Sequence, residues 1–396
     1  MSKVIMHIDL NAFFACAEEL RHPEWSGKPI VVAGEGPRSV VATASYQARA
    51  YGVHSAMRYY QAKELCPQAI FVPPDFGYYS MLSRSFFAYL KRYSLIIEEA
   101  SIDEGYVDMT KATQHVHDAY RYFGNIQAGL LKEIGLKCSI GVAPTKFLAK
   151  MASDMKKPMG ITFIYRKDLA TKLYPLPVGA CFGIGKKTVP HLQALGIQTI
   201  GDFQKMAAKD DPRLMELFGK SYASLKAAVN GRSSDVVDPT PMDPKSLGHS
   251  ETFDYDTNDV DFIKSKIHQL SMKVAAGVKR DKKKGKTIRL TLKDSEFRSH
   301  VKSNTLSEAT DDPETIYMNA CRLYEANYLG MMTRLVGVAL DNLVDPHEET
   351  VQMNFWNYGE YEKLDKTKLL VNELNRKMDK PALLLASEAK KKDGNS

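Results

Sequence analysis

The sequence predicts an α+β protein of several domains, one of them built on a ferredoxin-like sheet. A chain of 396 residues is too long for one ordinary core. Strand-like and helix-like segments between residues 4 and 166 follow the order β-α-β-β-α-β, if residues 18–71 are an insertion. A helical segment, a linker and a second α/β unit come after them.

The first unit begins with a strand-like run at 4–9 and a helix-like segment at 12–20. Within the insertion, two β-rich runs (29–34 and 39–45) precede two short helices (46–53 and 58–67). The remaining elements are a helix at 79–93, strands at 95–97 and 106–109, a helix at 117–134, a strand at 136–143, a helix at 145–155 and a strand at 160–165. This order predicts a sheet with helices on one face.

The second half divides into three parts. Residues 169–232 contain only short helical segments, separated by glycine-containing breaks. The stretch 233–246 is rich in Pro, Asp and Ser and lacks periodicity, so we expect a linker there. Residues 247–345 carry strand candidates at 251–256, 286–293 and 334–343 and helix candidates at 263–279 and 313–327. An amphipathic helix at 361–378 and a polar tail follow.

The composition is typical of a soluble globular protein, with 44% hydrophobic and 26% charged residues. No apolar run approaches the roughly 18 to 20 residues that span a bilayer, and His7 and Asp9 interrupt the apolar N-terminal stretch. We therefore expect a cytoplasmic protein with no membrane partner. The five cysteines are dispersed without a CxxC pair, and His115 and His117 have no other ligand cluster beside them, so a zinc or redox site is not favoured.

Positive charge is concentrated in one stretch. The chain has a net charge of +7, but residues 273–302 alone contain eleven Lys and Arg against three Asp and Glu. The sequence KRDKKKGKTIRLTLK joins a basic run to an alternating β run. Such a segment is either a solvated hairpin or a sheet that presents cations to a polyanion such as nucleic acid.

Three carboxylates occupy positions that a ferredoxin-like sheet would bring together. Asp9 ends the first strand, and Asp103 and Glu104 lie in the turn between two later strands. Clustered carboxylates repel one another; two Mg²⁺ ions would relieve the repulsion and could assist an in-line phosphoryl displacement. The alternative is that Asp9 caps the following helix and that SIDEG is a polar turn.

Further residues favour a phosphate-binding site. Tyr46 and Arg49 share one face of a predicted helix, where a guanidinium fork and a phenol suit a triphosphate. Lys157, in SDMKKP, adds a cation near the base of the sheet. In CFGIGKKTVPHLQALGI, a glycine-containing turn before a helix predicts a helix-hairpin-helix that binds phosphate without reading sequence.

Together these segments resemble the Y-family DNA polymerases, the translesion group that includes DNA polymerase IV and the UmuC-like (ImpB/MucB/SamB) proteins. The resemblance covers residues 1–345 in family order and lies in IDLNAFFACAEE, VVATASYQARAYGV, SIDEGYVDMT, SIGVAPTKFLAKMASDMKKPMGI, FGIGKKTVPHLQALGI and KSLGHSETF. It implies a right-hand polymerase with a palm (1–12 and 75–166), small fingers (13–74), a helix-hairpin-helix thumb (167–232), the linker (233–246), an α/β little finger (247–345) and a C-terminal tail (346–396).

The resemblance also implies roles for individual residues. Asp9, Asp103 and Glu104 match the catalytic, metal-binding carboxylates of the family, and the backbone carbonyl of Leu10 would also contact a metal ion. The implied triphosphate contacts are Thr43, Tyr46, Arg49 and Lys157.

Sugar and DNA contacts follow in the same way. Phe14 matches the steric gate that excludes a ribose 2′-OH, whereas Phe13 is expected in the core. The thumb hairpin would contact DNA through Gly183, Gly185 and Lys186. The little finger would contact the DNA backbone through Lys282, Lys283, Lys284 and Arg289.

The chain also departs from the family pattern. Gly105 stands where the family often has an alanine, and Glu98 and Glu99, close to the site, could tune metal affinity or face water. In the tail, QMNFW resembles a degenerate form of the peptide that docks bacterial family members on the sliding clamp. Its contacts would be Gln352, Phe355 and Trp356. The alternative is that this peptide folds back on its own domain.

The resemblance predicts a template-directed, low-fidelity DNA polymerase for translesion synthesis, acting in DNA repair, damage tolerance and the SOS response. It would use two Mg²⁺ ions, for which Mn²⁺ could substitute, to add dNTPs to a primer 3′-OH. We expect primer-template DNA, dNTPs and a sliding clamp as partners, a monomer in the nucleoid, and no proofreading, because no segment suggests an exonuclease domain. Two alternatives are a nucleotidyl cyclase, which would have no use for the thumb and the basic domain, and a non-enzymatic, clamp-bound DNA-binding protein.

Overall fold

The computed structural model of the chain describes residues 3–345, which belong to two compact units. The first unit is Met1–Asp243 and the second is Pro244–Ser396. The boundary between them falls in the segment 233–246, where the sequence indicates a linker. The finer division into palm, fingers, thumb and little finger remains a prediction. Within the described residues no helix has the length and apolar character needed to cross a membrane.

A five-stranded sheet organises the first unit, in the order β5-β6-β1-β7-β8. Its strands are β1 (Ile5–Leu10), β5 (Ile97–Glu99), β6 (Glu104–Asp108), β7 (Cys138–Ala143) and β8 (Ile161–Phe163). The central strand β1 pairs antiparallel with β6 and with β7, and β7 pairs parallel with β8. Every residue of β1 is buried, because both faces of the sheet are covered. This explains the apolar run in which His7 and Asp9 stand out.

Helices cover both faces of this sheet, whereas the sequence analysis expected them on one face. α4 (Phe76–Leu90) and α5 (Ala119–Ile134) pack on the face that carries Met6 and Ile8. α6 (Lys146–Asp154) packs on the opposite face, with Ile5. Its approach depends on Gly141 in β7, because a Cβ there would lie only 2.0 Å from the carbonyl oxygen of Ala149 in α6. The absence of a side chain at Gly141 therefore allows α6 to pack on this face of the sheet.

The insertion forms a small three-stranded sheet in the order β3-β2-β4. α1 (Phe13–Arg21) leads into the insertion, which contains η1 (Pro23–Trp25), β2 (Ile30–Ala33), β3 (Val41–Ala44), α2 (Tyr46–Arg49), α3 (Tyr59–Leu65) and β4 (Ile70–Val72). Its separate core includes Val31, Val41, Ala48 and Cys66. The Ser45 side chain caps α2 by accepting a hydrogen bond from the backbone of Ala48, so α2 begins directly after β3.

The segment that follows β8 is helical, as predicted, and shares a core with α6. Its elements are η2 (Arg166–Asp168), η3 (Leu169–Leu173), η4 (Val178–Ala180), α7 (Val189–Ala194), α8 (Ile200–Ala207), α9 (Pro212–Phe218), η5 (Gly219–Ser221) and α10 (Tyr222–Val229). The helices are short because glycine and proline interrupt the segment repeatedly.

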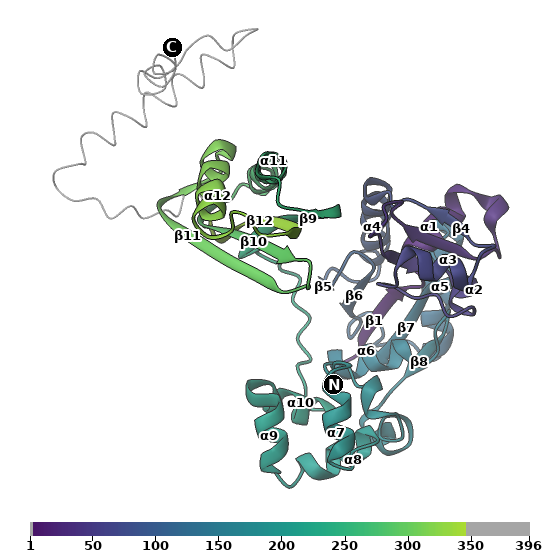
Figure 1. Cartoon of the computed structure of the whole chain (residues 1–396). Coiled ribbons are helices and arrows are strands. Elements are labelled where there is room, and N and C mark those ends of the chain that lie inside the picture. Colours follow the sequence, from purple (N-terminus) through teal and green to yellow (C-terminus); the bar gives the residue numbers. More distant parts are fainter. Residues whose placement is uncertain (1–2, 346–396) are drawn as a thin grey trace, which may run out of the picture. The chain divides into compact units, whose positions relative to one another are not determined.

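The second unit is a four-stranded antiparallel sheet in the order β11-β10-β12-β9. It comprises β9 (Ser246–Thr257), α11 (Val260–Arg280), β10 (Lys284–Asp294), β11 (Ser299–Thr310), α12 (Pro313–Asn327) and β12 (Thr333–Val344). Both helices lie on the same face of the sheet (Figure 1). β11 was not predicted from the sequence, because this edge strand is mostly polar and exposed and has no apolar alternation.

Candidate functional site

One polar cavity in the first unit gathers most of the candidate site residues. Its volume is about 300 Å³. β1, α1, β3, α2 and the segments next to β6 and α6 contribute to its wall. The lining residues are Asp9, Leu10, Ala12, Phe13, Phe14, Ala42, Thr43, Tyr46, Arg49, Ser55, Asp103 and Lys157. The structure thus brings together eight residues that the sequence analysis assigned to metal, triphosphate and sugar contacts.

The three carboxylates lie around the end of β1. Asp9 is opposite Glu104 in the pairing of β1 with β6, so both side chains point to the face that α6 covers. Glu104 is the first residue of β6 rather than a turn residue. Asp103 remains in the turn, where its Oδ1 accepts a hydrogen bond of 2.6 Å from Ser101 Oγ. Its backbone carbonyl accepts a hydrogen bond from Leu10 N at 2.9 Å, which ties the turn to β1.

Two lysines pair with these carboxylates. Lys150 in α6 places Nζ 3.1 Å from Asp9 Oδ2 and 2.5 Å from Glu104 Oε2. Lys157 places Nζ 2.8 Å from the same Asp9 oxygen and 2.8 Å from Asp154 Oδ1. Lys150 was not predicted as a site residue from the sequence. The available signal was its i,i+4 spacing to Asp154, which puts both residues on one face of α6.

Protonation equilibria at the site reflect this crowding. Burial, together with a hydrogen bond to Glu104, raises the pKa of Asp9. The approach of His7 Nε2 to within 3.4 Å, followed by the hydrogen bonds with Asp9 and Lys150, holds the pKa of Glu104 well below its usual range. Burial alone would lower the pKa of Lys150, but its hydrogen bond to Glu104 and the charge of Asp9 raise it. Lys150 therefore stays cationic between the two carboxylates.

The carboxylate oxygens of Asp9, Glu104 and Asp103 are donors of the kind that suits a divalent cation such as Mg²⁺. Asp9 and Glu104 share a site where a cation already balances their charge, and Asp103 and Leu10 line the same cavity. Mg²⁺ prefers one or two carboxylates, with water and phosphate oxygens completing its shell. Within residues 3–345, no three His, Cys, Asp or Glu side chains stand close enough to form a complete ligand set. Of the three carboxylates, the Asp103 side chain is the one that lies apart from the other two, and it accepts a hydrogen bond from Ser101.

The cationic wall of the cavity comes from α2. The Arg49 guanidinium lies 4.9 Å from the ring centre of Tyr46, and its Nε donates a hydrogen bond of 2.9 Å to the carbonyl of Ala44. This bond uses one nitrogen and orients the guanidinium. Thr43 in β3 and Lys157 line the same cavity. A guanidinium, a phenol and an ammonium around one hollow are suited to phosphate oxygens.

The two adjacent phenylalanines differ in burial. Phe13 is buried in the core, as expected, and Phe14 is half-buried; both contribute to the lining of the cavity. The ring of Phe14 stacks on Tyr79, with ring centres 4.3 Å apart and planes at 13°. The Tyr79 hydroxyl donates a hydrogen bond of 2.6 Å to the buried Glu18. This support for Phe14 was not predicted from the sequence, because residues 14, 18 and 79 belong to two helices that are far apart in the chain.

Two departures from the family pattern have structural explanations. Glu98 accepts two hydrogen bonds from Lys146 Nζ, at 2.9 and 2.8 Å, and a third from the backbone of Asp238 at 3.0 Å. It therefore joins β5, α6 and the segment after α10. At Gly105, a Cβ would lie 3.0 Å from the carbonyl of Glu98 and 3.0 Å from the ring of Phe87. An alanine there would require its neighbours to move.

The predicted thumb contacts lie in the turn before α7. Gly183 has a φ of 92°, which favours glycine, and Lys186 is exposed. The carbonyl of Gly185 accepts hydrogen bonds from the backbone of Thr188 at 2.9 Å and of Val189 at 3.3 Å. This turn is therefore ordered by its own backbone, while its role in DNA binding remains a prediction.

The predicted little-finger contacts differ in their surroundings. Lys282 is exposed in a left-handed turn with φ 55°, and Lys284 begins β10. Lys283 Nζ lies 3.1 Å from Asp345 Oδ1. Arg289 donates two hydrogen bonds to Asp341, from Nε at 2.7 Å and from Nη2 at 3.0 Å. The positive charge of Arg289 is therefore balanced within the sheet.

The face of this sheet opposite the two helices is open and polar. Ile288, Leu290 and Leu292 are buried on the helix side, so Arg289 and Lys293 point to the other side. Both line an open groove of about 410 Å³, whose floor includes Gly248, Ser250, Gly337 and Ala339. The tail residues Gln352, Phe355 and Trp356 lie outside the described residues.

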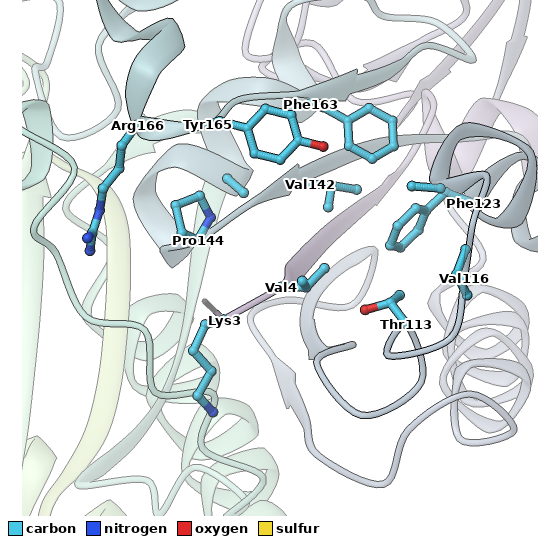
Figure 2. A pocket seen from close by; sticks show the side chains of 12 residues that line it. Lys3, Val4, Thr113, Val116, Phe123, Val142, Pro144, Phe163, Tyr165 and Arg166 are labelled. Atoms are coloured by element: carbon cyan, nitrogen blue, oxygen red, sulfur yellow. The ribbon is translucent and has the colours of Figure 1, made fainter. Parts of the chain in front are cut away.

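A second cavity in the first unit has a different character. It has a volume of about 340 Å³ and lies at the other end of β1 from Asp9. Figure 2 shows Val4, Phe123 and Val142 around its interior, with Phe163 and Tyr165 side by side. Its lining is apolar apart from Lys3, Thr113, Tyr165 and Arg166. It holds none of the predicted site residues, so the polar cavity is the candidate active site.

Two sequence profiles of one family match the chain. The profile of the impB/mucB/samB family matches residues 8–154, and the profile of its C-terminal domain matches residues 244–355. The chain belongs to this family. Both compact units therefore carry family sequence, which the two alternatives weighed in the sequence analysis do not explain.

Similar proteins agree with this assignment. DNA polymerase IV of Bacillus velezensis is 36% identical over 397 aligned residues, which cover 100% of this chain and 95% of that protein. DNA polymerase IV 1 of Bacillus subtilis is 36% identical over 398 residues, with the same coverage. DNA polymerase IV of Listeria monocytogenes is 38% identical over 354 residues, which cover 89% of this chain and 98% of that protein.

Solved structures show the same fold. A Y-family DNA polymerase chimera of Dbh and Dpo4 matches with a TM-score of 0.77 at 26% identity, covering 86% of this chain and 99% of the chimera. DinB from Sulfolobus solfataricus matches with a TM-score of 0.56 at 27% identity, with the same coverage. The resemblance to Y-family polymerases, the multidomain α+β fold class and the prediction of a DNA-directed DNA polymerase of the translesion group are confirmed.

Proposed function

We propose that this family member adds dNTPs to a primer 3′-OH under the direction of a DNA template, with low fidelity, and so allows synthesis past damaged bases. The polar cavity supports this proposal most directly. It combines the carboxylates of Asp9 and Asp103 with a guanidinium, a phenol and an ammonium that suit a triphosphate. The insertion that carries α2 is small, which favours an open pocket around the base pair.

Asp9, Glu104, Asp103 and the backbone carbonyl of Leu10 would hold two Mg²⁺ ions. Bound Mg²⁺ would neutralise the triphosphate and make the 3′-OH a better nucleophile, and Mn²⁺ could replace it. Lys150 keeps Asp9 and Glu104 together despite their like charge. The Asp103 side chain would leave its bond with Ser101 to join them.

Triphosphate contacts would come from four residues that line the cavity. Tyr46 and Arg49 face it from α2, and Thr43 from β3. Lys157 would exchange its partner Asp9 for a phosphate oxygen, because the ammonium lies within the cavity lining. These side chains neutralise charge and position the reacting phosphate, which is the main task of a protein in phosphoryl transfer.

The sugar of the nucleotide would lie against Phe14. Its ring is backed by Tyr79, which is fixed by Glu18, so it cannot retreat easily from a 2′-OH. We expect Phe14→Ala to accept ribonucleotides while primer-template affinity stays near that of the parent. Competitive primer extension with matched dNTP and rNTP pairs measures this. Discrimination as strong as in the parent would show that another side chain is the gate.

DNA would be held by the turn before α7 and by the basic part of the second unit. Lys282 and Lys284 are candidates for phosphate contacts. The binding constant for primer-template DNA should fall steeply as salt rises. The Lys282→Gln/Lys284→Gln variant should show a shallower dependence in fluorescence anisotropy, and an unchanged slope would contradict this role. Clamp binding by the tail, a monomeric state, a nucleoid location and the absence of proofreading remain predictions.

Primer extension with the full chain tests the proposed function. The parent should extend a primed template past a lesion with Mg²⁺ and dNTPs. Asp103→Ala should abolish extension, and Asp118→Ala, a change at the N-cap of α5, should keep it. Extension by Asp103→Ala at the rate of the parent would refute the assignment of the carboxylate site.

A further inference from the structure

His7 is a buried histidine in the middle of the central strand. Its side chain is 0% exposed and lies on the face of the sheet that α6 covers. Tyr106 and Gly141 are its neighbours on β6 and β7, and the ring of Tyr106 lies 4.7 Å from the imidazole ring. A buried imidazole must find partners for both ring nitrogens or lose stability. The partners of the two His7 nitrogens therefore indicate the role of this side chain.

The two nitrogens of His7 face Ser153 and Glu104. Nδ1 lies 2.8 Å from Ser153 Oγ in α6. Nε2 lies 3.4 Å from Glu104 Oε2. Among the described residues Nε2 has no hydrogen bond of regular geometry, so the carboxylate is the charged group available to it. The imidazole thus bridges α6 and the first residue of β6.

The Ser153 hydroxyl has a single proton. The group that accepts this proton determines which ring nitrogen of a neutral His7 can donate a hydrogen bond. Ser153 Oγ lies 2.8 Å from Nδ1 and 2.8 Å from the carbonyl oxygen of Lys150, so it can donate to either. If it donates to the carbonyl, a neutral imidazole must donate from Nδ1 and present a lone pair to Glu104, which is repulsive. If it donates to Nδ1, the ring proton is on Nε2 and points to Glu104. The second arrangement gives both ring nitrogens of His7 a partner.

We propose that His7 is a positioning residue for Glu104, with Ser153 selecting the tautomer that donates from Nε2 to the carboxylate. The inference rests on the proposed role of Glu104 at the metal site. His7 and Lys150 both contact Oε2, so together they orient the carboxylate across from Asp9. Lys150 has a long, flexible side chain, whereas the His7 ring is rigid and enclosed.

The consequence concerns metal binding more than nucleotide binding. Partners behind a metal-binding carboxylate typically change metal affinity or activity by about 10- to 100-fold when they are removed. His7 is absent from the lining of the polar cavity, so it has no direct contact with a nucleotide there. A loss of the bridge should therefore weaken metal binding and slow the chemical step, while the affinities for dNTP and DNA stay unchanged.

The test compares four variants of the full chain. His7→Phe keeps the ring without a donor, and His7→Gln keeps an N–H donor near the position of Nε2. Ser153→Ala removes the group that selects the tautomer. His115→Phe repeats the first substitution at an exposed histidine. Each variant is bound to primer-template DNA with a dideoxy primer end and dNTP, and free Mn²⁺ is followed by electron paramagnetic resonance. Single-turnover rates and dNTP affinity are measured with a normal primer.

We expect His7→Phe and Ser153→Ala to weaken Mn²⁺ binding and lower the single-turnover rate by about 10- to 100-fold. His7→Gln should recover most of both, and His115→Phe should match the parent. Parental Mn²⁺ binding in Ser153→Ala and His7→Phe would overturn the proposal, and so would equal losses in His7→Gln and His7→Phe. If His7→Phe does not fold, Ser153→Ala decides. Full activity of Asp103→Ala would instead refute the proposed function itself.

Discussion

The close packing of β7 against α6 predicts that Gly141→Ala lowers both the stability and the activity of the protein. Gly141 lies where a Cβ would be 2.0 Å from the carbonyl oxygen of Ala149 and 2.4 Å from the backbone nitrogen of Ser153. Both atoms belong to the backbone of α6 and cannot rotate away. Gly141→Ala must therefore push the helix away from the sheet.

The magnitude follows from the cost of overpacking. Inserting one methyl group into a close-packed contact costs about 1 to 3 kcal/mol, and more when backbone atoms must move. For a unit of this size each kcal/mol lowers the melting temperature by roughly 2 to 4 °C, so we expect a loss of about 2 to 12 °C. A shift of α6 by about 1 Å also moves Lys150 and Ser153, which should slow catalysis by about 100-fold.

Gly124 provides a matched control in the same unit. It lies in α5, where a Cβ would meet only Ile161 Cδ1 at 4.0 Å, an ordinary contact. Gly124→Ala should therefore raise the unfolding free energy by about 0.5 to 1 kcal/mol, because alanine favours a helix. Differential scanning calorimetry and single-turnover extension measure both variants. If Gly141→Ala is as stable and active as the parent while Gly124→Ala behaves as expected, then the close packing of α6 against Gly141 does not control stability or activity.

Two further predictions concern buried and charged groups. Tyr79→Phe removes the hydrogen bond to the buried Glu18 and should lower the unfolding free energy by about 1 to 3 kcal/mol in thermal unfolding, whereas Tyr78→Phe should change little. A hydrogen bond from His300 lowers the pKa of Asp294, so the carboxylate stabilises the folded protein above its unfolded pKa of about 3.9 and loses that effect as pH falls. The melting temperature of Asp294→Asn should therefore fall less than that of the parent between about pH 5 and pH 3, and parallel curves would contradict this.

Local pattern was sufficient for much of the fold. The run at 4–9, the helix at 313–327 and the helical segment after β8 all appear where their periodicity predicts them. The features that were not predicted are those that depend on contacts with neighbouring elements. β11 is a polar edge strand, and its strand conformation comes from pairing with β10. The position of α6 depends on Gly141, whose effect becomes visible only when two elements are packed together.

The candidate site shows the same division. Asp9, Phe14, Arg49 and Lys157 stand in recognisable motifs, and the structure places them around one cavity. The side chains that support or pair with predicted site residues do not all stand in recognisable motifs. Tyr79 reaches Phe14 through a contact between α4 and α1 that spacing along the chain does not reveal. Arg289 was predicted as a DNA contact from its charge, yet Asp341 on the adjacent strand holds it by two hydrogen bonds.

The side chains that pair with the carboxylates and with His7 come largely from α6. The helix supplies Lys150 to Asp9 and Glu104 and Ser153 to His7, and the chain then continues to Lys157 in the cavity. A glycine in β7, which carries no chemistry, sets the distance at which these side chains meet the carboxylates. The organisation of the site is therefore a packing property of the sheet and of α6. Substitutions at this contact should change metal binding and catalysis together, even where no catalytic residue is altered.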